Sequence, residues 1–182
     1  MIICIVGKTS SGKDSVAKIA KELFNLDMIV SYTTRPKRDY ETDGVEHYFI
    51  SKERMKEIRE NDTMIAYTIN KKTGIEYCAT IEAMPSDIMI YIINPNGIKY
   101  MKRNNIDFIS VYVDCSNDKI LLRGSLRGDS LMTLTERLSS EIDEFDSYKN
   151  SKCYDYLIDN NGTYEELKSQ TINVFNKILN IQ

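Results

Sequence analysis

The stretch that decides the fold is GKTSSGKDS, Gly7 to Ser15, which directly follows the apolar run MIICIV at residues 1–6. Its glycines and lysine have the spacing of a phosphate-binding loop, G-x-x-x-x-G-K-[ST]. Glycines allow the backbone angles that turn successive N–H groups toward one anion, and a following helix adds the positive end of its dipole. Because the helical pattern SVAKIAKELF follows at 15–24, the sequence predicts a strand, a phosphate loop and a helix.

The end of this loop bears on its ligand. Lys13 brings a point charge to the terminal phosphates of a nucleotide, and Ser15 can offer a hydroxyl. Asp14 stands where a magnesium-binding hydroxyl is usual. Two interpretations of Asp14 stay open: magnesium takes carboxylate oxygens readily, whereas an acidic residue in a first helical turn is favoured without any metal.

Beyond the loop, apolar runs alternate with helical patterns. We expect buried strands at DIMIYII, DFISVYV and YDYLI, residues 87–93, 107–113 and 154–158. We expect helices at about 94–104, 116–123, 133–149 and from 163 onward. Thr133 with Glu136, and Thr163 with Glu166, have the spacing of capping boxes. The alternation predicts an α/β fold of three layers around a central parallel sheet, the P-loop fold.

The region after residue 30 breaks this alternation. It offers short strand candidates and one helical pattern, namely HYFI at 47–50, SKERMKEIRE at 51–60, MIAYTI at 64–69 and GIEYCA at 74–79. We therefore expect one domain over residues 1–182. Its parts are a core of residues 1–30 and 81–182 and a small mixed α+β insert of about residues 31–80.

Composition excludes several classes of protein. The net charge of −3 gives no global basic field for binding nucleic acid. The four cysteines form no C-x-x-C pair, and His47, the one histidine, rules out an H-E-x-x-H zinc site. No apolar run is long enough to span a membrane, and the run at residues 1–6 is shorter than the apolar part of a signal peptide, so we expect a cytoplasmic location.

A second basic segment, SYTTRPKRDYETDGVEHYFIS at residues 31–51, brings Arg35, Lys37 and Arg38 close together. The planar fork of arginine suits a phosphate, although a run of charges is also compatible with a solvated loop. Glu41 adds acceptor oxygens for a sugar or a base. With a phosphate loop in the same chain, two separate anion sites indicate phosphoryl transfer between two phosphorylated molecules.

Taken together, the two segments resemble the guanylate kinase family. That family follows its phosphate loop with S-x-[ST]-T-R-x-P-R-x-x-E-x-x-G-x-x-Y-x-F, and the residues in register here are Ser31, Thr34, Arg35, Arg38, Glu41, Gly44 and Phe49. The resemblance covers nearly the whole chain. LLRGSLRGDS at 121–130 matches an arginine-bearing lid, and YDYLIDN at 154–160 matches a strand that ends in an asparagine near the adenine.

The resemblance implies an ATP-dependent phosphotransferase with Mg²⁺ as cofactor, ATP as donor and a GMP-like acceptor. We expect no nucleic-acid or membrane partner, and either a monomer or a homodimer. The residues expected to bind ATP are Gly7, Lys8, Thr9, Ser10, Ser11, Gly12, Lys13, Asp14, Ser15, Arg123 and Asn160. Those expected to bind the acceptor are Ser31, Arg35, Arg38, Glu41, His47, Tyr48 and Tyr77. The resemblance makes Lys13, Arg35, Arg127 and Arg137 catalytic, makes Asp14 the metal ligand, and puts the lid at about 124–134.

Several positions depart from the family pattern. His47 stands where the family usually has a phosphate-contacting tyrosine. The family usually reads guanine with a glutamate and a serine or threonine, and the aligned residues here are Ala66 and Ala79. In a shifted register, Thr68, Glu76 or Thr80 would supply these groups instead. Because a guanine amide edge without partners binds less well, these alanines predict relaxed or altered base specificity.

The leading interpretation is a nucleoside monophosphate kinase that phosphorylates GMP or dGMP. Two enzymatic alternatives stay open: a kinase for another nucleotide, and a relative of the same fold that phosphorylates ribose 1,5-bisphosphate. The loop of that relative resembles S-G-K-D-S at 11–15, and it needs no guanine-reading groups. An alternative of another class is a non-catalytic guanylate-kinase-like module that binds a phosphopeptide, although such modules usually lack the loop lysine and lid arginines present here.

Overall fold

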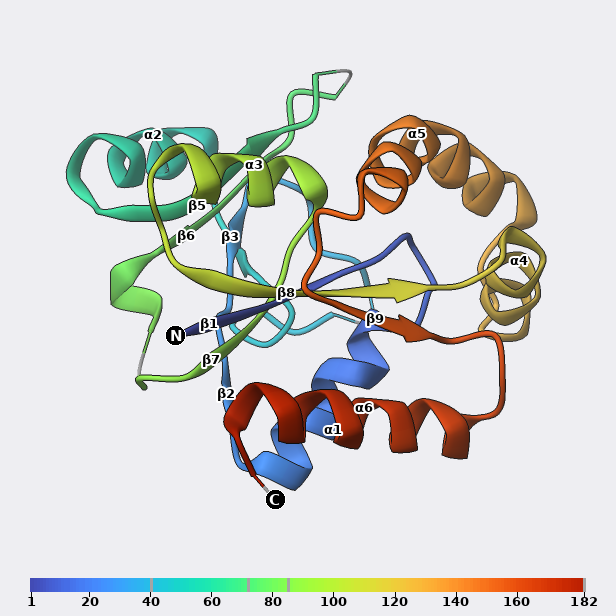
Figure 1. Ribbon diagram of the computed structural model, residues 1–182. Helices are drawn as coiled ribbons and strands as arrows, with labels where there is room; N and C mark the ends of the chain where they lie inside the picture. Colours follow the sequence, from blue (N-terminus) through green and yellow to red (C-terminus); the bar gives the residue numbers. More distant parts are fainter. Residues whose placement is uncertain (40, 72, 85, 182) are drawn as a thin grey trace.

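The computed structural model describes residues 1–39, 41–71, 73–84 and 86–181, and over these residues the chain forms two sheets with helices around them (Figure 1). The larger sheet is parallel and has the order β2–β7–β1–β8–β9. Its strands are β1 (Ile2–Val6), β2 (Asp27–Met28), β7 (Met89–Ile92), β8 (Phe108–Asp114) and β9 (Tyr156–Asp159). This sheet confirms the predicted α/β fold around a central parallel sheet.

Helices cover both faces of the larger sheet (Figure 1). They are α1 (Lys13–Phe24) and α6 (Tyr164–Leu179) on one face, and α3 (Pro95–Arg103) and α5 (Leu131–Ser151) on the other. In β1, Ile3 and Ile5 pack among the residues of α1 and α6, whereas Cys4 and Val6 pack among those of α3 and α5. Because both faces are buried, the strands are continuous apolar runs. The phosphate-loop sequence begins where β1 ends, at the carboxyl edge of this sheet.

A smaller sheet has the order β4–β3–β6–β5. Its strands are β3 (Tyr32–Thr33), β4 (Tyr48–Phe49), β5 (Met64–Ile69) and β6 (Glu76–Thr80), followed by a 3₁₀ turn at Ile81–Ala83. Helix α2 (Lys52–Asn61) covers one face, where Met55 and Ile58 pack on Cys78. On the other face, Ala66 and Ala79 join the core that α3 and α5 form with the larger sheet. The two sheets therefore share one apolar core.

Helices α4 (Asn117–Leu126) and α5 pack together, and residues 127–130 connect them, so the range predicted as a lid, about 124–134, also includes the end of α4 and the first turn of α5. The helix start predicted at Thr133 is wrong, because α5 begins at Leu131 with Ser130 in the N-cap position. The chain already turns at Gly128, where φ is 90°, so the helix begins earlier than the capping-box signature indicates. The box of Thr163 and Glu166 at the start of α6 is confirmed, with each side chain accepting the other residue's backbone N–H.

Of the three shortest strands, β4 lies within the predicted run HYFI, but β2 and β3 were not predicted. Strands β2 and β3 have two residues each, and two residues show no periodicity from which a strand can be inferred. No helix in the described ranges is long and apolar enough to cross a membrane.

Candidate functional site

The loop between β1 and α1 is shaped by positive φ angles, 52° at Ser10 and 94° at Gly12. Both glycines of the motif are also required by packing. A Cβ on Gly12 would lie 2.1 Å from Nδ2 of Asn160, and a Cβ on Gly7 would lie 2.5 Å from Oγ of Ser11. At both glycines of the motif, the backbone therefore lies too close to neighbouring atoms to leave room for a Cβ.

Residues that follow β8 and β9 support this loop. The side chain of Asn160 is buried, and its Nδ2 donates a hydrogen bond of 2.7 Å to the carbonyl oxygen of Ser11. Its Oδ1 accepts a hydrogen bond of 3.2 Å from Arg123. Arg123 also donates to Sγ of Cys115 at 3.4 Å. Arg123 and Asn160, both expected on the ATP side, are thus joined to each other and to the loop.

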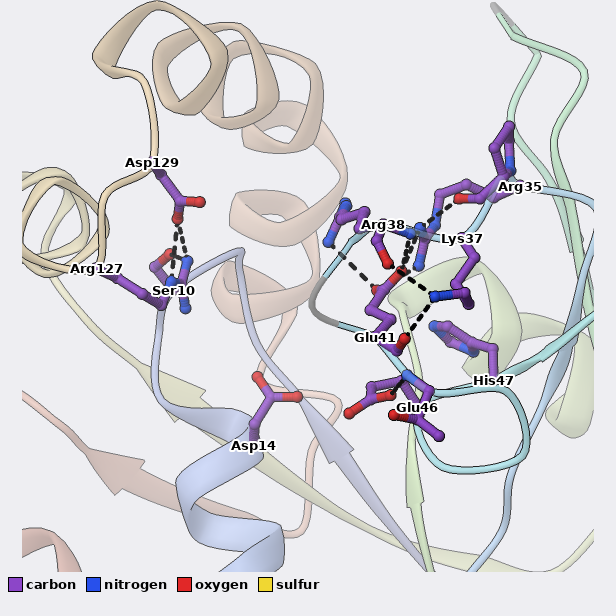
Figure 2. Close-up of polar contacts among 12 residues, drawn as sticks. Ser10, Asp14, Arg35, Lys37, Arg38, Glu41, Glu46, His47, Arg127 and Asp129 are labelled. Carbon is purple, nitrogen blue, oxygen red and sulfur yellow. Dashed lines mark hydrogen bonds and ion pairs between the residues drawn. The ribbon is translucent and has the colours of Figure 1, made fainter.

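Lys13 and Asp14 lie in the first turn of α1 and differ in exposure. Nζ of Lys13 is 3.5 Å from the carbonyl oxygen of Lys8 and 3.8 Å from Oδ2 of Asp14. The side chain of Lys13 is 22% exposed and that of Asp14 is 75% exposed. In Figure 2 the Asp14 carboxylate projects from the start of α1, so it is open to a ligand from solvent.

Helix α5 brings two acidic side chains to the loop that were not singled out in the sequence. Oε2 of Glu141 accepts the Thr9 N–H at 2.7 Å, and Oδ1 of Asp146 lies 2.6 Å from the buried Nζ of Lys8. Burial raises the pKa of Glu141, although the Thr9 N–H and nearby cations oppose this effect. The one-turn spacing between Arg137 and Glu141 was the available signal, because it puts both on one helical face.

The connection between α4 and α5 also reaches the loop. Nη2 of Arg127 donates a hydrogen bond of 2.9 Å to Oγ of Ser10, while the same guanidinium pairs with Asp129 (Figure 2). Arg137, on α5, acts electrostatically on Glu141. Both arginines expected to be catalytic on the lid side therefore lie near the loop or near a residue that contacts it.

A second cluster of cations is built around Glu41 (Figure 2). Arg35 makes two hydrogen bonds to its carboxylate, at 2.9 and 2.7 Å. The Arg38 N–H donates to the same carboxylate at 2.8 Å, and Nζ of Lys37 donates to the Glu41 carbonyl at 2.9 Å. Hydrogen bonds from Arg35 lower the pKa of Glu41 to about 2 against the effect of burial. With its side chain 4% exposed, Glu41 gathers these cations rather than presenting free oxygens to a sugar or a base.

His47 lies beside this cluster. Its Nδ1 is 2.8 Å from Oγ of Ser31, and its ring makes edge contacts with Phe49 and Tyr77 at centroid distances of 5.9 and 5.6 Å. The guanidinium of Arg35 lies 5.3 Å from the centre of the Phe49 ring. Burial lowers the pKa of His47, and the charge of Arg35 adds to this effect, so the neutral imidazole is favoured.

The pairing of the small sheet explains which residues meet. Thr33 pairs with both Phe49 and Tyr77, which carries the loop around Glu41 and the end of β6 to one place. Tyr48 is not brought to this group, because its ring stacks on Tyr32 at 5.1 Å, on the face that α2 covers. The residues that the structure does bring together are Ser31, Arg35, Arg38, Glu41, His47 and Tyr77.

The two alanines that align with base-reading positions of the resembled family are direct neighbours. Ala66 pairs with Ala79 across β5 and β6, and both are buried in the shared core. Neither of these two side chains carries a polar atom, although the next residue of β6, Thr80, has a buried Oγ1 without a hydrogen-bond partner in the described part of the chain.

Several known proteins are similar to this chain in sequence or in fold. The family model described as guanylate kinase matches residues 1–174. The guanylate kinase of Helicobacter hepaticus is 30% identical over 166 residues, which cover 87% of this chain and 82% of that protein. The guanylate kinase of Helicobacter pylori is 29% identical over 168 residues, covering 87% and 79%. A crystal structure of guanylate kinase from Anaplasma phagocytophilum matches the fold with a TM-score of 0.69 at 19% identity, over all of this chain and 86% of that one.

Proposed function

Because this chain belongs to the guanylate kinase family, whose members are ATP-dependent phosphotransferases, we propose that it transfers the γ-phosphoryl group of ATP to GMP or dGMP. The products are ADP and GDP or dGDP. The observation that carries the proposal is the pair of separate cationic groups, one at the phosphate loop with Lys13 and one organised by Glu41. Two phosphorylated molecules need two such sites.

The donor side of the proposal uses the loop from Gly7 to Ser15, Arg123 and Asn160. Backbone N–H groups and Lys13 hold the ATP phosphates, and Arg127 and Arg137 stabilise charge on the group in transfer. The bond of Arg127 to Ser10 supports this, because it already brings the guanidinium to the loop. Phosphoryl transfer depends mostly on positioning and charge, so no general base is required.

The chemistry of Asp14 fits a magnesium ion. In the described part of the chain no three His, Cys, Asp or Glu side chains are grouped as a metal site. Magnesium at kinase sites is bound by one or two carboxylates together with substrate phosphates and water, so a single exposed carboxylate beside the loop is sufficient. When bound, the ion neutralises charge on the phosphates.

The acceptor side of the proposal uses Arg35 and Arg38 for the monophosphate, with Ser31, His47 and Tyr77 as hydrogen-bond partners. Glu41 acts through the arginines, because it fixes their positions. We also propose that residues 31–80 and 124–134 move as an acceptor-binding insert and a lid. Their closure over both substrates would exclude water and limit hydrolysis of ATP.

One observation favours a second acceptor. The buried pair of Ala66 and Ala79 offers no polar group to a guanine edge, whereas ribose 1,5-bisphosphate needs none. Phosphorylation of ribose 1,5-bisphosphate would use the same donor site and the same arginines as phosphorylation of GMP or dGMP. The two functions differ only in the part of the acceptor molecule beyond the phosphate that the arginines bind.

The test is an ADP-release assay with ATP and Mg²⁺ over GMP, dGMP, AMP, UMP, CMP and ribose 1,5-bisphosphate. The proposal expects the highest kcat/KM with GMP or dGMP. Turnover of ribose 1,5-bisphosphate with none of GMP or dGMP above background would replace the first candidate by the second. ATP binding without turnover of any acceptor would favour the phosphopeptide-binding module.

A further inference from the structure

The phosphate loop already holds an anion that belongs to the protein. The Thr9 N–H donates to Oε2 of Glu141 at 2.7 Å, a distance typical of a strong hydrogen bond to a charged acceptor. Thr9 lies within the loop from Gly7 to Lys13, whose N–H groups are the expected partners of donor phosphate. A carboxylate of α5 thus occupies a donor group of the phosphate site.

The surroundings of Glu141 are those of a phosphate. Lys13, Arg137 and Lys8 all act on its carboxylate electrostatically, and each favours the charged form. Burial opposes them, and the pKa of Glu141 is raised. The carboxylate is therefore partly desolvated, and the Thr9 N–H is its hydrogen-bond donor in the loop.

A second contact joins the same helix to the same loop. Lys8 pairs with Asp146 of α5 at 2.6 Å, a little more than one helical turn beyond Glu141. Helix α5 also carries Arg137 one turn before Glu141. Both contacts with the loop therefore come from the helix that bears an arginine of the proposed catalytic set.

We propose that Glu141 is an internal ligand of the phosphate loop, which the donor phosphate displaces from the Thr9 N–H, so that donor binding releases this part of α5. The inference rests on the proposed role of Gly7 to Ser15 as the donor site. One N–H cannot serve a carboxylate and a phosphate at full strength, and two anions in one nest repel each other. Glu141 therefore weakens ATP binding and couples it to the position of Arg137.

The test is the dissociation constant of ATP, measured by calorimetry with Mg²⁺, for the wild type, Glu141→Gln and Glu144→Gln. The matched control is on the same helix, and its carboxylate also accepts a backbone N–H, that of Asn96 at 2.9 Å, away from the loop. Burial raises the pKa of Glu144 as it does that of Glu141. We expect Glu141→Gln to tighten ATP binding about tenfold, and Glu144→Gln to change it less than twofold. Glu141→Ala should tighten binding as well, and it serves if the glutamine variant does not fold.

The contact itself is tested by the backbone amide resonances of the protein without ligand. Glu141→Gln should shift the Thr9 amide and Glu144→Gln the Asn96 amide, each without the other. An unmoved Thr9 resonance in Glu141→Gln would overturn the inference. Wild-type ATP affinity in both Glu141 variants would also overturn the inference, but it would leave the proposed donor site unaffected. A wild type that binds no ATP at millimolar concentration would instead overturn the proposed function, and the inference with it.

Discussion

The side-chain amide of Asn160 donates a hydrogen bond of 2.7 Å to the carbonyl oxygen of Ser11, although the two residues are 149 positions apart. The backbone N–H of Asn160 donates to the Asp114 carbonyl at 2.8 Å, so the amide is fixed at the end of the parallel sheet. The shape of the phosphate loop therefore depends on the last strand, β9, as well as on its own glycines.

This relationship predicts the effect of Gly12→Ala. The new Cβ would lie 2.1 Å from Nδ2 of Asn160 at a φ of 94°, so both a clash and backbone strain result. We expect the free energy of unfolding to fall by about 3 kcal/mol. Gly74→Ala is the control, because Gly74 also has positive φ, 68°, with nothing within 4 Å of its Cβ. It should cost roughly 1 kcal/mol in urea unfolding. If Gly12→Ala and Gly74→Ala lose the same free energy of unfolding, the contact with Asn160 does not constrain the loop.

Lys13→Ala should lower kcat at least about 100-fold with every acceptor, because a cation is removed from the transferred phosphate. The side chain is partly exposed and has two long contacts, with the Lys8 carbonyl oxygen and with Asp14, so the free energy of unfolding should change by less than about 0.5 kcal/mol. Lys18→Ala, on the same helix but in an exposed pair with Glu22, should leave kcat unchanged. Full activity of Lys13→Ala would refute the phosphate-loop mechanism.

Asp14→Ala tests the two interpretations of this carboxylate, because a serine would restore the hydroxyl that usually binds magnesium at this position. If Asp14 binds magnesium, its loss should raise the Mg²⁺ concentration for half-maximal rate roughly fivefold, the equivalent of about 1 kcal/mol for a solvated charge pair. Glu22→Ala, which removes an exposed carboxylate at the other end of α1, should leave that concentration unchanged. An identical magnesium titration for Asp14→Ala would favour a simple first-turn charge.

Glu41→Gln should destabilise the protein by about 2 kcal/mol, because Arg35 and Arg38, both partly buried, lose their charged and buried partner. The pKa of Glu41 is about 2 in the folded protein, against an ordinary value of 4.5, so its contribution is complete above about pH 4.5 and is lost as the pH falls toward 2. Unfolding experiments from pH 7 to pH 2 should show that the difference in free energy of unfolding between wild type and variant becomes smaller as the pH falls from 4.5 toward 2.

The control for Glu41 is Glu57→Gln. Glu57 pairs with Arg54 at 2.8 Å on the surface of α2, with both side chains more than half exposed. The free energy of unfolding of that variant should fall by no more than about 0.5 kcal/mol at any pH. If the loss of unfolding free energy in Glu41→Gln stays constant below pH 4, the loss does not come from the ionised carboxylate.

Local patterns predicted most of the fold. Continuous apolar runs indicated the longer strands of the parallel sheet, because burial on both faces removes the alternation of an exposed strand. The start of α5 was missed because Ser130 and Thr133 are both suitable N-caps, and the choice between them depends on the turn at Gly128. The two-residue strands β2 and β3 are defined by pairing with distant segments, and no local signal in the sequence indicated them.

The candidate site was predicted in part for a similar reason. The spacing in GKTSSGKDS and the register from Ser31 to Phe49 are properties of short segments, and they predict that Lys13 and Arg35 belong to two different anion sites. The orientation of Tyr48 is different, because it depends on which face of β4 the helix α2 covers.

By itself, then, the sequence determined the α/β alternation, and it predicted a phosphate loop and the arginines of two anion sites, because each is encoded in the spacing of neighbouring residues. Only the tertiary structure decided that Glu41 holds those arginines, that Asn160 supports the loop and that Glu141 occupies it. These contacts form where helices and strands pack, and packing brings together residues whose separation along the chain carries no signal.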